Sequence, residues 1–189
     1  MEQAPNLTQL LSSFAKGDVR AAEQVIPLVY DELHRIAHRR RWQWGGSESP
    51  GTTSLVHEVY VNLVERSHAD WRDRSHFFYF ASVAMRNILI DSAKRVSRAK
   101  RGGGEPQIPP GEHTFVSEQR SDELLALDQV LDRLRSSDER LSRIVECRFF
   151  GGLSVEETAD ALAISPATVK RGWDTARAWL YKELKPEGF

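Results

Sequence analysis

The chain has 189 residues, of which 40% are hydrophobic and 28% charged, as in an ordinary globular protein with one large or two small domains. The formal net charge of −1 gives no overall sign of a nucleic-acid partner. No apolar run approaches the roughly 20 residues that cross a bilayer, and the N-terminus lacks a signal-peptide pattern. We therefore expect a cytoplasmic protein without membrane insertion. The single cysteine, Cys147, excludes an internal disulfide and is expected in the core.

Helical periodicity dominates the first half of the chain. Apolar residues recur at three- and four-residue spacing over 7–14, 22–37, 55–64 and 77–88. No window alternates apolar and polar residues convincingly, as a half-buried strand would. We therefore predict an all-α fold.

The stretch SPGTTSLVHEVYVNLVER, residues 49–66, contains the start of the third of these helices. Three hydroxyl residues, Thr52, Thr53 and Ser54, precede its apolar face, and its first acidic residue is Glu58. Ser and Thr are favoured helix N-caps, so at least one of the hydroxyls is expected to cap the helix. Three adjacent hydroxyls exceed what a cap needs.

Positive charge gathers near the end of the fourth helix. Residues 1–101 carry 15 Lys/Arg against 11 Asp/Glu, whereas residues 102–189 carry 11 against 16. Between residues 86 and 101, six cations are opposed only by Asp91, a pattern suited to a phosphate backbone. A solvated helix end that complements the helix dipole would explain the same cluster.

Residues 101–119, RGGGEPQIPPGEHTFVSEQ, interrupt the helical pattern. They include four glycines and three prolines and show no apolar periodicity, which is typical of a linker. We predict two helical domains, at residues 1–101 and 121–189, joined by a flexible linker at 102–120.

The second domain contains a helix-turn-helix pattern. Ser154 and Glu157 have the spacing of a capping box at the start of a short helix. After a tight turn, Ser165 is suited to cap the next helix and Pro166 to occupy its first position. The N-terminal part of that helix exposes Lys and Arg, which in such motifs reach guanine edges or phosphates in the major groove.

Two stretches together resemble bacterial sigma factors. Residues 122–184, from DELLALDQ to WLYKEL, look like their promoter minus-35 binding domain, and the basic N-terminal half looks like their minus-10 domain. Within it, FFYFASVAMRNILIDSAKR, residues 77–95, resembles the promoter-melting helix of the extracytoplasmic function (ECF) group of the sigma-70 family. The resemblance covers nearly the whole chain. It implies a sigma factor, not an enzyme and without cofactor, that binds the clamp of core RNA polymerase and directs promoter recognition and melting.

The resemblance, with the chemistry of the side chains, gives three groups of candidate site residues. The minus-35 DNA contacts are expected from Ser165, Thr168, Lys170, Arg171 and Arg177. The minus-10 contacts, including a stacking pocket for a displaced base, are expected from Trp71, His76, Asn87, Lys94, Arg95 and Arg98. Core polymerase contacts are expected from Leu55, Glu58, Asn62 and Glu65. Phe77 and Phe80 are expected to pack in the core.

The start of the polymerase-binding helix departs from the family pattern. Most ECF members have several acidic residues there, whereas this chain has Gly51, Thr52, Thr53 and Ser54. Together with LVHE and TVKRGW, this departure resembles a subgroup associated with Ser/Thr protein kinases. A phosphate adds about −1.5 to −2 charge and is well placed at a helix N-terminus. We hypothesise that phosphorylation, first at Thr53 and otherwise at Thr52 or Ser54, creates the clamp-binding surface. An anti-sigma factor is a further partner that the resemblance allows.

Two alternatives stay open. A stand-alone helix-turn-helix regulator would bind operator DNA without polymerase, although the chain shows no evident coiled coil for dimerisation. A metal-dependent hydrolase could use His34, His38 and Glu58, but no third ligand at a fixed spacing supports zinc, and we expect no metal site.

Overall fold

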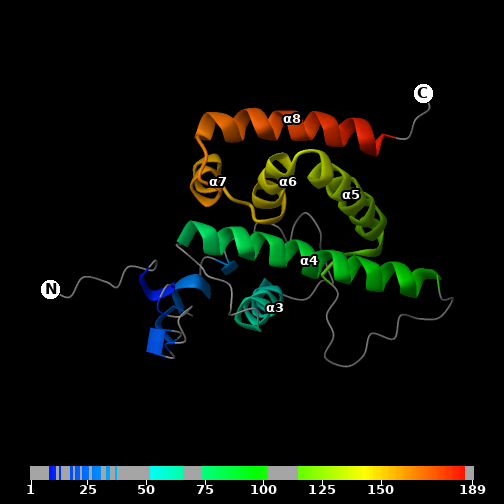
Figure 1. The fold of residues 1–189 in the computed structure, drawn as a ribbon. Helices are drawn as coiled ribbons and strands as arrows, with labels where there is room; N and C mark the ends of the chain where they lie inside the picture. Colours follow the sequence, from blue (N-terminus) through cyan, green and yellow to red (C-terminus); the bar gives the residue numbers. More distant parts are fainter. Residues whose placement is uncertain are drawn as a thin grey trace.

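The computed structural model describes residues 9–11, 13, 18, 20, 21, 23–25, 27–30, 33, 34, 37, 52–65, 74–101 and 115–185. Throughout these ranges the regular elements are helices and no strand is present, which confirms the predicted all-α fold (Figure 1). Two predicted site features, Trp71 and His38, lie outside the described residues, as does most of the predicted linker. Among the helices described, none is both long and apolar enough to cross a membrane.

The described helices from residue 52 onward are α3 (Thr52–Glu65), α4 (Arg74–Arg101), α5 (Glu118–Ser137), α6 (Glu139–Val145), the π-helix η1 (Glu146–Phe150), α7 (Val155–Leu162) and α8 (Pro166–Leu184). The long helix α4 crosses the middle of the molecule, with α3 on one side and α5 to α8 on the other (Figure 1). It is therefore the element that joins the two predicted domains.

One hydrophobic core runs through both predicted domains. Helix α4 contributes Phe77, Met85 and Leu89, which are at most 2% exposed, and Phe80 packs against the same core while partly buried. Leu131 of α5 and other buried residues of α3, η1 and α8 belong to it as well. Apolar side chains on more than one side of a helix predict burial on more than one side. The central position of α4 follows from this pattern.

The end of the predicted linker is part of the packed structure. Phe115 and Val116 are 3% and 4% exposed, and the backbone N–H of Phe115 donates a hydrogen bond to Ser92 Oγ on α4, at 2.7 Å. Helix α5 begins at Glu118, so Glu118 to Arg120 are helical where the sequence predicted linker. The sequence did not predict that Phe115 and Val116 pack against α4, because two adjacent apolar residues show no helical or strand periodicity.

Two short helical elements, α6 and η1, follow α5. Asp138 ends α5 and caps α6, its carboxylate accepting a hydrogen bond from the Leu141 N–H at 3.1 Å. From Glu146 the backbone continues as a π-helix, whose last bond runs from the Gly151 N–H to the Glu146 carbonyl at 2.9 Å. A π-helical turn is wider than an α-helical one, so the side chains that follow it point in other directions than they would on a regular α-helix. The π-helix was not predicted from the sequence.

The predicted pair of helices near the C-terminus is confirmed in its capping. Ser154 Oγ accepts from the Glu157 N–H at 3.0 Å, and the Glu157 carboxylate accepts from the Ser154 N–H at 2.7 Å, forming the capping box. Ala163 ends α7 in the left-handed conformation with φ 53°. Ser165 caps α8, with Pro166 at its first position. Capping and backbone conformation therefore define the turn, and Ala159 of α7 packs with Val169 of α8 and Ile144 of α6 in a small core.

Candidate nucleic-acid and polymerase interface

Helix α8 presents the cations predicted to contact the minus-35 element. Lys170, Arg171 and Arg177 are exposed, and Thr168 is partly buried. Lys170 and Arg177 lie seven residues apart and so share one side of the helix, with Arg171 about a quarter-turn away. The other side of α8 is buried through Val169, Gly172, Ala176 and Leu180. The three cations are therefore exposed on a helix whose opposite side packs against the rest of the protein.

The two hydroxyls at the start of α8 are engaged with each other. Ser165 Oγ accepts from the Thr168 N–H at 3.1 Å and lies 2.8 Å from Thr168 Oγ1. Ser165 is thus used in the cap, as its position at the N-cap predicts. Because a hydroxyl has further acceptor capacity, an additional contact to a phosphate is chemically compatible with the cap.

Gly172 allows α8 to lie close to α6. A Cβ atom at this position would lie 2.5 Å from Ile144 Cδ1 and 3.3 Å from Leu141 Cδ2. Arg148 in η1 also braces α8, with its guanidinium 5.6 Å from the ring centroid of Trp173. Sequence reasoning did not identify either contact, since neither residue has a diagnostic spacing.

Helix α4 carries the described residues predicted to contact the minus-10 element. His76, near its start, packs edge-on against Phe80 with ring centroids 4.8 Å apart. Lys94 and Arg98 are exposed, and Arg98 Nε donates to the Lys94 carbonyl at 3.2 Å. Asn87 and Arg95 are partly buried. From His76 to Asn87 the helix rises about 16 Å, so the predicted stacking residue and the polar cluster form separate parts of one surface.

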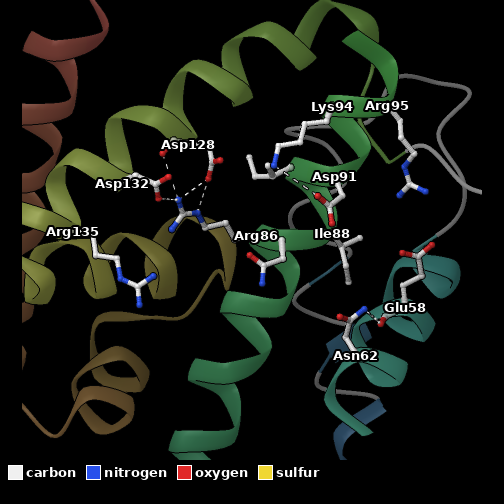
Figure 2. Close-up of a pocket in the computed structure, with 12 residues that line it drawn as sticks. Glu58, Asn62, Arg86, Ile88, Asp91, Lys94, Arg95, Asp128, Asp132 and Arg135 are labelled. Atoms are coloured by element: carbon white, nitrogen blue, oxygen red, sulfur yellow. Dashed lines mark hydrogen bonds and ion pairs between the residues drawn. The ribbon is translucent and has the colours of Figure 1, made fainter. Parts of the chain in front are cut away.

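A polar groove of about 390 Å³ lies between α3, α4 and α5 (Figure 2). It brings together residues that the sequence assigned to different partners. Glu58 and Asn62 of α3, predicted to contact polymerase, face the same groove as the predicted DNA contacts Asn87, Lys94 and Arg95. The opposite wall comes from the second predicted domain and consists of Asp128, Asp132 and Arg135 of α5.

Arg86 closes one end of this groove. Its guanidinium donates to Asp128 Oδ1 at 2.6 Å, to Asp132 Oδ1 at 2.8 Å and to Glu146 Oε1 at 2.9 Å (Figure 2 shows the two aspartates). The Arg86 residue is 6% exposed and Glu146 2%. Burial alone would lower the pKa of Arg86, but the hydrogen bonds that its guanidinium donates to Asp128 and Asp132 leave the pKa raised. One cation on α4 is therefore held by three carboxylates from α5 and η1.

The carboxylate of Glu146 also accepts a hydrogen bond from the Tyr79 hydroxyl, with Tyr79 Oη 3.4 Å from Glu146 Oε2. Burial raises the pKa of Tyr79 to about 12, and the negative charge of Glu146 acts in the same direction. Burial likewise raises the pKa of the neighbouring Cys147 thiol. The thiol therefore stays protonated, and the cysteine is a core residue as predicted.

The start of α3 has the character expected from its sequence. Its first turn contains no acidic residue, Thr53 is exposed, and Ser54 is partly buried. Leu55 is 5% exposed and belongs to the core, so among the predicted polymerase contacts Glu58 and Asn62 are the ones with described side chains at the surface groove. Asn62 Nδ2 donates to the Glu58 carbonyl at 3.1 Å. Thr52 and Glu65 are the first and last residues of the helix.

The described residues include no group of three or more His, Cys, Asp or Glu side chains that could hold a metal ion. In the predicted hydrolase set, His34 lies beside Tyr30, with ring centroids 6.2 Å apart, while Glu58 faces the groove on α3. His38 lies outside the described residues.

An all-helical chain with exposed cations on α8 and on the long helix α4 has the features of a DNA-binding transcription factor. The family model for ECF sigma factors matches residues 4–186, and the chain belongs to this family. The family consists of transcription initiation factors that act on DNA, and it is not a family of enzymes. Its members work with core RNA polymerase and promoter DNA, often under the control of anti-sigma factors. No curated protein matches the chain.

Proposed function

We propose that this chain binds core RNA polymerase and directs it to promoters, with α8 contacting the minus-35 element and α4 the melted minus-10 element. The observation that carries the proposal is the family match over residues 4–186, which spans both cationic helices. A stand-alone regulator would need only the C-terminal helices. The proposed units are residues 1–101 for the minus-10 element and polymerase, 102–120 as connector, and 121–189 for the minus-35 element.

The minus-35 contacts are proposed to come from Lys170, Arg171 and Arg177, supported by Ser165 and Thr168. Their exposure beside a buried opposite face supports this assignment. The minus-10 contacts are proposed to come from α4 and its approach, through stacking at Trp71 and His76 and cationic contacts at Lys94, Arg95 and Arg98. Unstacked bases favour aromatic surfaces flanked by cations.

We further propose that the chain belongs to the kinase-associated subgroup and that phosphorylation controls polymerase binding. Three features support a site at Thr53: it is exposed, it lies in the first turn of a 14-residue helix, and that turn contains no acid. A phosphate there would meet the free N–H groups and the positive end of the helix dipole. It would supply the negative charge that other members carry as Asp or Glu. Such a protein would act in the cytoplasm, with a Ser/Thr kinase as partner.

The experiment is a titration of fluorescently labelled core polymerase with two forms of the protein, unmodified and phosphorylated at Thr53. We expect tight binding only from the phosphorylated form. The matched control is phosphorylation-blocked Thr53→Ala treated with the kinase. Equal binding by the unmodified and phosphorylated forms would assign the hydroxyls to capping alone, which stabilises a helix by about 1 kcal/mol without any kinase.

A further inference from the structure

Helix α4 is covered on the side that faces the C-terminal helices. It packs against α5, η1 and α7, and Figure 1 shows α5 and α7 on the same side of it. Phe78, Ala81, Met85 and Leu89 share one face of α4 by their spacing and are buried in the core. The proposed promoter-melting helix is thus packed between α3 and the C-terminal helices.

The contact between the halves contains a charge cluster, which consists of Arg86, Asp128, Asp132 and Glu146. The side chain of Arg86 is 7% exposed and that of Glu146 is 3%, whereas Asp128 and Asp132 are 19% and 67% exposed. All three carboxylates belong to α5 or η1, and the only guanidinium in the cluster belongs to α4. Separating the halves would leave Arg86 without these partners, and Glu146 without a counter-charge, unless water or another partner replaced them.

The shapes of the two halves also fit closely beside this cluster. A Cβ atom on Gly151, which directly follows η1, would lie 1.9 Å from Ser82 Oγ on α4. Ser82 is 1% exposed and its hydroxyl donates to the Phe78 carbonyl at 2.8 Å. A larger side chain at residue 82 therefore cannot fit unless α4 and η1 move apart.

Two carboxylates of α5 line the same groove as the residues proposed to contact DNA and polymerase. Asp128 and Asp132 line it together with Arg135, while Asn87, Lys94 and Arg95 line it from α4, and Glu58 and Asn62 from α3. The two aspartates carry the same sign of charge as a DNA backbone. A DNA strand and α5 would therefore compete for one surface.

We propose that the cluster of Arg86, Asp128, Asp132 and Glu146 is a latch that keeps the free protein closed, so that engagement with polymerase requires α5 and η1 to leave α4. The inhibitory part of this inference rests on the proposed function, whereas the latch itself does not. If only the open form binds polymerase, the apparent affinity for polymerase equals the affinity of the open form multiplied by the fraction of molecules that are open. A latch that favours the closed form therefore weakens polymerase binding.

The test measures the distance between spin labels at His57→Cys on α3 and Ala178→Cys on α8, both exposed positions, in a Cys147→Ala background. One variant is Asp128→Asn/Asp132→Asn, which removes two charges at nearly unchanged shape. A second is Ser82→Leu, which opens the contact by volume. The matched control is Glu183→Gln, which removes the 2.9 Å pair of Arg133 and Glu183 between α5 and α8 and leaves α4 untouched.

We expect a narrow distance distribution for the unaltered latch and for Glu183→Gln, and a broad, longer one for the two opening variants, all with native helical content by circular dichroism. The opened forms should bind core polymerase at least about threefold more tightly, since more molecules are competent. Unchanged distances in both variants would overturn the latch, and opened distances with unchanged affinity would overturn its inhibitory role. If no form binds polymerase, phosphorylated protein included, the proposed function fails, while the distances still decide the latch.

Discussion

Nη1 of Arg86 lies 2.9 Å from Oε1 of Glu146, and both side chains are almost completely shielded from solvent although they are 60 residues apart. A buried ion pair contributes little net stability when compared with an apolar pair, but removing one partner leaves the other charged and uncompensated. In this protein the pair also joins α4 to η1. Its loss should therefore affect both stability and the arrangement of the helices.

Replacing Arg86 by Ala should lower the free energy of unfolding by about 3–5 kcal/mol, since Glu146 would remain buried without its cation. Urea denaturation followed by circular dichroism measures the change. The matched control is Lys100→Ala, which removes an exposed ion pair between α4 and Asp122 of α5 and should cost less than about 1 kcal/mol. Similar losses from both variants would contradict the assignment of Arg86 as the main ionic contact.

Tyr79 should ionise at a higher pH than an ordinary tyrosine. Its pKa is raised to about 12 by burial and by Glu146, against an ordinary value near 10. Because the folded-state pKa lies above the unfolded one, the contribution of the neutral phenol to stability is complete below about pH 10 and is lost as the pH rises through 12. An alkaline titration of tyrosinate absorbance, with Tyr79→Phe subtracted, measures this pKa. Ionisation near pH 10 in the folded protein would contradict the buried contact.

Gly172→Ala should destabilise the protein through a single atomic clash. The new Cβ would lie 2.5 Å from Ile144 Cδ1, and such overpacking costs about 1–3 kcal/mol, more than the gain of up to about 1 kcal/mol from helix propensity. Ile144→Val deletes that Cδ1 atom. In the Ile144→Val background, Gly172→Ala should therefore be neutral or stabilising, as read from a double-mutant cycle of unfolding free energies. An equal cost in both backgrounds would show that the clash is not the cause.

Arg171→Ala should abolish promoter choice and leave core polymerase binding unchanged, because Arg171 is exposed on α8, away from the groove on α3. Loss of a bidentate contact to a base costs about 1–3 kcal/mol of discrimination. Competition between promoter and mutated minus-35 sequences measures it, with the exposed Arg140→Ala on α6 as control. Full discrimination by the Arg171 variant would remove this residue from the proposed contacts.

The capping signals illustrate what could be predicted from sequence. Ser154, Glu157, Ser165 and Pro166 act within a few residues of one another, so their spacing was sufficient to predict both helix starts, and the structure confirms them. Periodicity likewise sufficed for the all-α fold. The start of α3 without acidic residues was also visible in the sequence.

The closed arrangement was not predictable in the same way. Apolar patterns show that α4 has buried sides, but they do not say which helix covers each side. The ion pairs of Arg86 join residues 42 to 60 positions apart, and no local spacing marks them. Asp128 and Asp132, four residues apart on α5, are an ordinary solvated pair until α4 is placed beside them. The π-helix at Glu146–Phe150 was not predicted either, because no local spacing in the sequence marks it.

The decisive measurement for the proposed function is transcription in vitro by core RNA polymerase on fragments of genomic DNA, with transcript starts identified by sequencing. Reactions contain the unmodified protein, the Thr53-phosphorylated protein or neither. We expect starts at a common promoter sequence with the phosphorylated protein, few with the unmodified one and none with core alone. Absence of specific starts with both forms, together with tight binding of the free protein to duplex DNA, would contradict the proposed function and favour a stand-alone regulator.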